Sequence, residues 1–287
     1  MSYLPCELFC RVRDNQTVQS VSEYAENDHL AVIALMDNEA KNGKVSIINA
    51  LSSAGVTALG GTYRLDESVS ADENISKVKA FGGVAGVSLM GESSIKNWRN
   101  VDFLEIWHGA FSPDNTYNDR AIRLWNTLLD RGYHIACTYA RDTEDDFDIN
   151  AHYGCTYVDI EGEANALNAV KGIRMGKTVA STGVKFFFRT HQKGKTYSLG
   201  ETMKKGNAVF SFFTDLHSRE KNAGDDDVEY NIIKLITNGG ECVMQTACSE
   251  RHVNVRLKSN HWYRAELWGR VNSRNVLLAV TSPIYTA

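Results

Sequence analysis

The chain has 287 residues, of which 43% are hydrophobic and 23% are charged, and its formal net charge is −4. These proportions are typical of a globular protein with a sizeable core, organised as one large domain or two smaller ones. A weakly acidic chain gives no electrostatic reason to expect binding to nucleic acid or to an anionic membrane, and no apolar run approaches the roughly 20 residues that cross a bilayer.

The N-terminus and the cysteines predict a cytoplasmic location. The first ten residues lack the basic and apolar regions of a signal peptide, and the six cysteines include no CxxC spacing. Scattered cysteines in a chain of this length are typical of reduced thiols rather than of disulfides or a zinc cluster.

Seven short apolar runs predict buried strands, at residues 7–12, 30–35, 56–60, 84–89, 103–107, 134–139 and 155–160. Helical spacing lies between most of them: Thr17 is placed to cap one helix, and Gly132 to end another that has Ile122, Trp125 and Leu129 on one face. Alternating strands and helices predict a parallel sheet, so an α/β fold with a seven-stranded β/α barrel is expected over residues 1–183.

The character of the sequence changes at about residue 184. Short β-type runs broken by Gly, Asn and Lys follow one another to the end of the chain, as in KFFFRT, AVFSFF and WYRAELWG. This spacing predicts an antiparallel β-sandwich over residues 184–287.

Charged residues follow the sixth apolar run, in the segment TYARDTEDD at residues 138–146. In a β/α barrel the chemistry lies in loops after the carboxyl ends of the strands. Asp142 and Glu144 are therefore candidates to meet a metal or a substrate, and a solvated loop is the alternative.

Several strand-end segments resemble the PHP (polymerase and histidinol phosphatase) superfamily of metal-dependent phosphoesterases, in particular its carbaryl-hydrolase-like branch with a C-terminal β domain. They are ELFCRV with the helix and strand that follow it, FGGVAGVSLMGE, VDFLEIWHG, GYHIACTYARDTEDDF, and GKTVASTGV with the terminal TSPIYTA. The resemblance implies a seven-stranded barrel that holds two or three divalent ions for phosphoester hydrolysis.

The metal ligands implied by this resemblance are mostly replaced. Where the family has histidine or glutamate ligands, this chain has Phe9, Arg11, Asn38, Tyr63, Leu89 and Glu144. Asp37 and Asp142 remain, and Glu105 is kept on its strand. Because phenylalanine and leucine cannot coordinate a metal, a multinuclear centre of the family type is not expected.

Three interpretations of the remaining polar residues stay open. Arginines that replace the lost metal charge would pair with Glu7, Asp37 and Asp142. We expect Arg11 to pair with Asp142, and Arg141 to reach solvent or the acidic cluster at residues 144–146. An arginine could instead grip a phosphate or carboxylate ligand, because its planar fork suits such groups. A rebuilt site holding one divalent cation (Mg²⁺, Mn²⁺ or Zn²⁺) would use Asp37, His108, Asp142 and Glu144.

The sequence thus predicts a degenerate PHP-like protein, without phosphoesterase activity or a bound cofactor, that binds a small anionic ligand or acts as a scaffold. A divergent metal-dependent hydrolase and a structural, homo-oligomeric subunit are the alternatives. No catalytic residue is assigned. The ligand-binding candidates are Arg11, Asp37, Tyr63, Arg64, His108, Asp142, Glu144 and His152.

Overall fold

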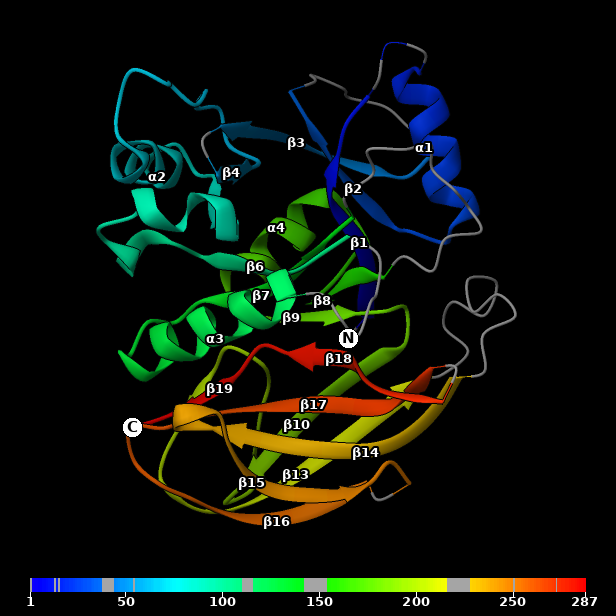
Figure 1. Cartoon of the computed structure of the whole chain (residues 1–287), viewed down its shortest axis with the longest axis vertical. Helices are drawn as coiled ribbons and strands as arrows, with labels where there is room; N and C mark the ends of the chain where they lie inside the picture. The colour runs from blue at the N-terminus through cyan, green and yellow to red at the C-terminus, as the bar shows by residue number, and fades with distance from the viewer. Residues whose placement is uncertain are drawn as a thin grey trace.

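The computed structural model describes residues 2–12, 14, 16–37, 44–53, 55–109, 116–141, 154–215, 228–249, 251–271 and 273–287. Within these ranges the chain has nineteen strands and four α-helices: α1 (Val18–Asn27), α2 (Ala71–Ala80), α3 (Thr116–Asp130) and α4 (Ala166–Arg174). All four helices lie among the N-terminal strands, and the other end of the molecule is built from strands (Figure 1). None of the described helices is both long and apolar enough to cross a lipid bilayer.

Fifteen strands form one mixed sheet. Its main path runs in the order β12 (Thr202–Met203), β19 (Ile284–Thr286), β17 (Trp262–Val271), β18 (Arg274–Thr281), β9 (Thr178–Ser181), β8 (Cys155–Ile160), β1 (Ser2–Cys10), β2 (Val32–Met36), β3 (Ser46–Ser53), β4 (Val56–Leu59), β5 (Val84–Val87), β6 (Phe103–His108) and β7 (Ala136–Ala140). β14 (Val228–Thr237) pairs with β17 and with β15 (Glu241–Ala247). A second sheet has the order β11 (Lys195–Tyr197), β10 (Lys185–Gln192), β13 (Gly206–Asp215) and β16 (His252–Leu257).

The predicted seven-stranded β/α barrel followed by a β-sandwich is therefore wrong. β3 was not predicted, because its sequence SIINALSS lacks a continuous apolar run. In the structure most of this strand is only partly buried. It forms an antiparallel hairpin with β4, and β8 runs antiparallel to β1. A hydrophobic pattern identifies a buried strand, but it does not show which strand lies beside it or in which direction that neighbour runs. The alternation of strands and helices suggested a purely parallel sheet, whereas the sheet of this chain is mixed.

Strands occupy each of the β-type runs predicted after residue 184, but they do not form a separate sandwich. β18, near the end of the chain, pairs with β9 and so extends the N-terminal sheet. Four phenylalanines of the smaller sheet, among them Phe186 and Phe210, pack into a core that also contains Tyr157 and Leu35 from the N-terminal strands. The domain boundary between residues 183 and 184 stays a prediction.

The two predicted helix signals are confirmed. The Thr17 side chain accepts a hydrogen bond from the Ser20 amide, and the Ser20 side chain accepts one from the Thr17 amide, which completes a capping box for α1. Trp125 and Leu129 of α3 are buried, and Gly132 after its end has a φ of 81°, a backbone conformation that favours glycine.

Side chains join β7 to strands that are not its backbone neighbours. Thr156 Oγ1 of β8 accepts from the Tyr139 amide at 2.9 Å and donates to the Tyr139 carbonyl at 3.0 Å. Ser282 Oγ, between β18 and β19, accepts from the Cys137 amide at 3.0 Å. These buried bonds bring the end of β7 close to β1, and this is where the polar residues described below gather.

Candidate functional site

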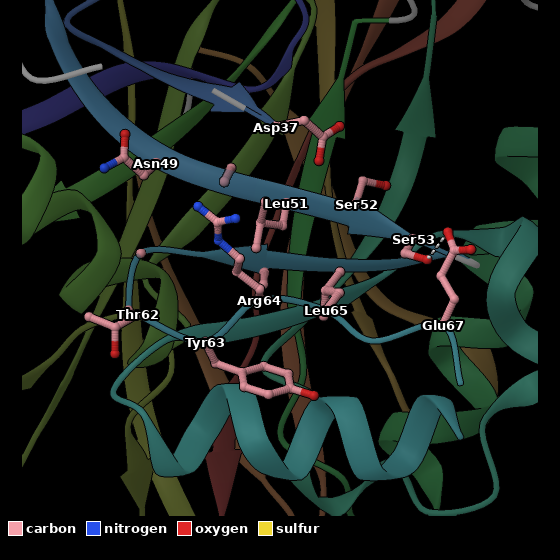
Figure 2. Close-up of a pocket in the computed structure, with 14 residues that line it drawn as sticks. Asp37, Asn49, Leu51, Ser52, Ser53, Thr62, Tyr63, Arg64, Leu65 and Glu67 are labelled. Atoms are coloured by element: carbon pink, nitrogen blue, oxygen red, sulfur yellow. Dashed lines mark hydrogen bonds between the residues drawn. The ribbon is translucent and has the colours of Figure 1, made fainter. Parts of the chain in front are cut away.

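A cavity of about 550 Å³ lies beside β3 and β4 (Figure 2). Its polar lining includes Asp37 after β2, Asn49 and Ser52 on β3, and Arg64 and Glu67 in the loop after β4. Its apolar lining is supplied by Leu51, Ala58 and Leu65. The cavity therefore combines an apolar wall with a few polar groups, as small-molecule sites commonly do.

Two glycines let the loop after β4 turn back over this cavity. Gly60 and Gly61 have φ values of 65° and 78°. A Cβ atom on Gly61 would lie 2.7 Å from the Gly83 backbone nitrogen, so a larger residue does not fit there. The turn places Tyr63 and Arg64 immediately beside the cavity.

Tyr63 and Arg64 have different surroundings. Tyr63 Oη donates to Asn74 Oδ1 at 3.0 Å, and its ring stacks on Phe81 with centroids 5.8 Å apart. Figure 2 shows the ring of Tyr63 turned toward a helix, and the guanidinium of Arg64 turned the other way, toward the strand that carries Asn49 and Leu51. Tyr63 therefore anchors the loop to α2, and Arg64 supplies the cation among the described residues that line the cavity.

Arg11 pairs with Asp37, which lines the cavity. Its Nη1 lies 3.3 Å from Asp37 Oδ2, and the two side chains are 54% and 48% exposed. The predicted partner, Asp142, lies outside the described residues. Because the observed pair is half-exposed and has one contact, it is a weak ion pair rather than a buried replacement for a metal.

Arg141 is buried, so the predicted exposure to solvent is wrong. Its alternative predicted partners, the acidic residues 144–146, lie outside the described residues. The guanidinium of Arg141 bonds Asp28 and donates from Nε to the Gly154 carbonyl at 3.2 Å, with Glu7 Oε2 3.6 Å away. The prediction assumed that strand alternation continues through this position. β7 ends at Ala140, so the alternation of side chains no longer applies.

Glu7 is fully buried in β1 beside this arginine. Its Oε1 accepts from the amides of Phe9 at 2.9 Å and Arg141 at 3.2 Å, whereas its Oε2 makes no hydrogen bond. Burial raises the pKa of Glu7 to about 7, although the charge of Arg141 and the two amides act to lower it. The Phe9 amide lies where the β1–β2 register is irregular, so the carboxyl group replaces a strand hydrogen bond.

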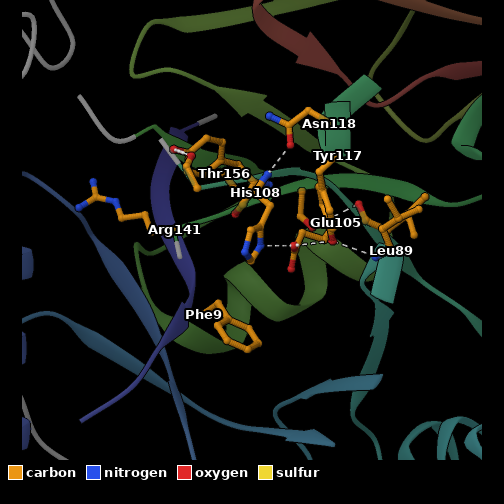
Figure 3. A network of polar contacts seen from close by, with 12 residues as sticks. Phe9, Leu89, Glu105, His108, Tyr117, Asn118, Arg141 and Thr156 are labelled. Atoms are coloured by element: carbon orange, nitrogen blue, oxygen red, sulfur yellow. Dashed lines mark hydrogen bonds and ion pairs between the residues drawn. The ribbon is translucent and has the colours of Figure 1, made fainter. Parts of the chain in front are cut away.

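A second polar network joins β6 to the first turn of α3 (Figure 3). The Nδ1 of His108 lies 2.6 Å from Glu105 Oε1, which also accepts from Tyr117 Oη at 3.3 Å. Tyr117 Oη accepts from the Leu89 amide, and the His108 amide donates to Asn118 Oδ1 at 2.8 Å. Burial, reinforced by the charge of Glu105, raises the pKa of Tyr117. Glu105 thus fixes the orientation of the His108 ring.

The structure brings Asp37, Tyr63 and Arg64 together in the cavity lining, and Arg11 contacts this group through Asp37. It places His108 in the separate network with Glu105. Asp142, Glu144 and His152 lie outside the described residues. In the part of the chain that the structure describes, no three His, Cys, Asp or Glu side chains gather closely enough to hold a metal ion.

Sequence reasoning missed Asp28, Tyr117 and Asn118, and it missed the cavity itself. Asp28 follows the end of α1, where an acidic residue has no unusual meaning in the sequence. Tyr117 and Asn118 lie in the first turn of α3, and the loop–helix boundary was the one signal that could have pointed to them. The cavity depends on β3, which was not predicted.

No known protein family matches the chain, and no curated protein is significantly similar to it in sequence. The resemblance to the PHP superfamily stays a prediction, and the function has to be argued from the chemistry of the cavity and its surroundings.

Proposed function

We propose that the chain binds a small ligand through a phosphate or carboxylate group in the cavity beside Arg64, and that it does not hydrolyse phosphoesters in the manner of PHP enzymes. The observation that carries this proposal is a guanidinium on a cavity of about 550 Å³, a volume within the range of small-molecule sites. The planar fork of arginine matches the paired oxygens of either acidic group.

The rest of the lining suits a polar ligand with an apolar part. Asn49, Ser52 and Thr62 can exchange hydrogen bonds with hydroxyl or carbonyl groups, and Leu51 and Leu65 offer apolar contact. Such a combination lets a few directed polar groups fix the orientation of a ligand while apolar contact excludes water.

The two carboxylates of the cavity lining are both engaged with neighbours. Asp37 pairs with Arg11, and Glu67 Oε1 accepts from the Ser53 hydroxyl at 3.2 Å. Among the described residues of this cluster, Arg11 and Arg64 formally balance the charges of Asp37 and Glu67. With respect to these four side chains, an acidic group beside Arg64 enters neutral rather than acidic surroundings, which keeps the electrostatic cost of binding low.

One observation favours a hydrolase as the second candidate. The short contact between His108 and Glu105 orients an imidazole through a carboxylate, an arrangement found in general-base and metal sites. If the chain is a hydrolase, a divalent ion should activate ester hydrolysis, and His108→Ala should abolish that activity. Oligomeric scaffolding remains the third candidate, which mass in solution would test.

The proposal is tested by titrating inorganic phosphate and acetate into the protein in a calorimeter. Arg64→Gln should weaken phosphate binding roughly tenfold to a hundredfold, since hydrogen bonds to charged groups contribute about 1.5–3 kcal/mol. The control is Arg120→Gln, which removes an exposed arginine paired with Glu92 and should bind as the parent does. Equal binding by parent and Arg64→Gln would refute the site. Metal-dependent turnover of a generic phosphodiester would favour the second candidate.

A further inference from the structure

We propose that Asp37 competes with the ligand for Arg11: Asp37 lines the cavity and its carboxylate holds Arg11, and an entering acidic group takes the place of that carboxylate, so that Arg11 and Arg64 hold the ligand together. This inference rests on the proposed anion binding. It adds a second cationic residue to the site and an autoinhibitory contact.

The backbone that leads into each member of the pair belongs to the sheet. Asp37 follows β2, whose five residues are all buried, and its amide donates to the Ala50 carbonyl at 2.8 Å. Arg11 follows Cys10, which is buried and paired with Leu35. Any rearrangement of the pair therefore falls on the side chains, and these are about half exposed.

The backbone conformation of Asp37 gives its side chain a place on the cavity. With a φ of 58° it lies in the left-handed region, which aspartate and asparagine adopt more readily than most residues. The chain thereby leaves the line of β2, and Asp37 contributes to the cavity lining. One acidic group is thus already present where the proposed ligand would bring another.

The contact between Arg11 and Asp37 is of a kind that a ligand can replace. It consists of one pair of atoms at 3.3 Å between half-exposed side chains, and such surface pairs are weak. A phosphate or carboxylate that engages guanidinium groups through two oxygens forms shorter and stronger bonds. Replacing the Arg11–Asp37 contact by a two-oxygen contact between Arg11 and the ligand therefore favours the bound state.

If Asp37 bound the ligand or a metal directly, replacing it would weaken binding. This inference predicts instead that replacing Asp37 strengthens phosphate binding. Asp37→Asn keeps the size of the side chain and suits the left-handed backbone, so the variant should fold. It removes the competing charge and releases Arg11. Binding of inorganic phosphate should tighten roughly fivefold to tenfold, the scale of one like-charge interaction at contact distance in water.

The experiment measures the dissociation constant of inorganic phosphate for the parent, Asp37→Asn, Arg11→Gln and the double variant. Arg11→Gln should weaken phosphate binding. Asp37→Asn should strengthen binding less in the Arg11→Gln variant than in the parent, because part of the effect of Asp37→Asn acts through Arg11. The control is Glu67→Gln, which removes the other lining carboxylate, the partner of Ser53, and should tighten binding less than Asp37→Asn does.

The outcomes separate this inference from the function on which it rests. If Arg64→Gln abolishes binding while Asp37→Asn leaves it unchanged or weaker, the competition is refuted and anion binding stands. If the parent binds no phosphate, both ideas are refuted. Binding of a divalent ion that is lost in Asp37→Asn would make Asp37 a metal ligand and would also overturn the inference.

Discussion

The carboxyl group of Glu7 is fully buried, and it shares the guanidinium of Arg141 with the carboxylate of Asp28. Arg141 bonds Asp28 more closely than it approaches Glu7, and Glu105 adds a further negative charge that raises the pKa of Glu7. With the pKa of Glu7 raised to about 7, this carboxyl group keeps a proton in the folded state over a range in which the unfolded chain has lost it.

The first prediction concerns pH. Because the folded pKa of Glu7 lies above its ordinary value near 4.5, its contribution to stability is fully present below about pH 4.5 and is lost as the pH rises through 7. The loss amounts to roughly 3 kcal/mol. Glu7→Gln, which cannot ionise, should remove this slope from urea unfolding curves measured between pH 5 and pH 8.

The exposed Glu23→Gln is the control for this pH prediction and should follow the parent. Comparing variant with parent also cancels other titrations, such as that of His134, whose pKa burial lowers and whose effect on stability has the opposite sign. The same slope in Glu7→Gln as in the parent would show that Glu7 is ionised throughout this range.

Two arginines provide a second prediction. Arg11→Ala should change the free energy of unfolding by less than about 0.5 kcal/mol, because its pair with Asp37 is exposed. Arg141→Ala should cost roughly 3–5 kcal/mol, because it leaves Asp28 and Glu7 buried without a cation. Denaturant melts of both variants test this, and the reverse order would contradict the burial of Arg141.

The candidate residues show how far residue patterns could predict the site. Asp37 and Arg64, two of the ligand-binding candidates taken from the sequence, line the cavity. Strand alternation failed for Arg141 because the strand had ended one residue earlier. The partners Asp28 and Glu7 come from elsewhere in the chain, and no local pattern encodes such a meeting.

At the scale of elements, α3 is fastened to β17 by a buried arginine. Arg264 is 1% exposed, donates to Glu266 Oε1 at 2.7 Å and bonds Asn126 of α3. Its guanidinium lies over the rings of Trp125 and Trp262, 4.7 Å and 5.4 Å from their centroids. The cation thus meets aromatic faces and hydrogen-bond acceptors from both elements, which offsets its removal from water.

The third prediction follows from this contact. Arg264→Ala should lower the free energy of unfolding by roughly 3–5 kcal/mol, since it leaves Glu266 buried without its cation. Arg256→Ala, on the exposed side of β16, should stay within about 0.5 kcal/mol. Thermal unfolding of the two variants gives the comparison. A tolerated Arg264→Ala would mean that α3 docks on β17 without depending on this cation.

The elements were predictable in proportion to the strength of their local pattern. α1 and α3 carry an apolar face and recognisable ends, and both were predicted. β3 has small and polar residues, and β9, with the sequence TVAS, has only two apolar residues, so neither stood out. These two strands decide the connections of the sheet: β3 pairs with β4, and β9 joins β8 to β18.

At the scale of the molecule, hydrogen bonds and core packing cross the predicted boundary at residue 183. β18 pairs with β9, Ser282 bonds the Cys137 amide, and Phe186 shares a core with Tyr157. Our fourth prediction is that residues 1–183 and 184–287, expressed separately, lack cooperative unfolding, because each piece exposes part of that core. A cooperative melt of either fragment would show that the boundary separates independent domains.

The central claim is that the cavity beside Arg64 binds an anionic group. The most direct test follows backbone amide NMR signals of the full chain during a titration with inorganic phosphate. We predict saturable shifts at Thr62, Arg64 and Leu65 and at Asp37, and their loss in Arg64→Gln. The absence of saturable shifts there, or shifts gathered instead around Glu105 and His108, would contradict the account.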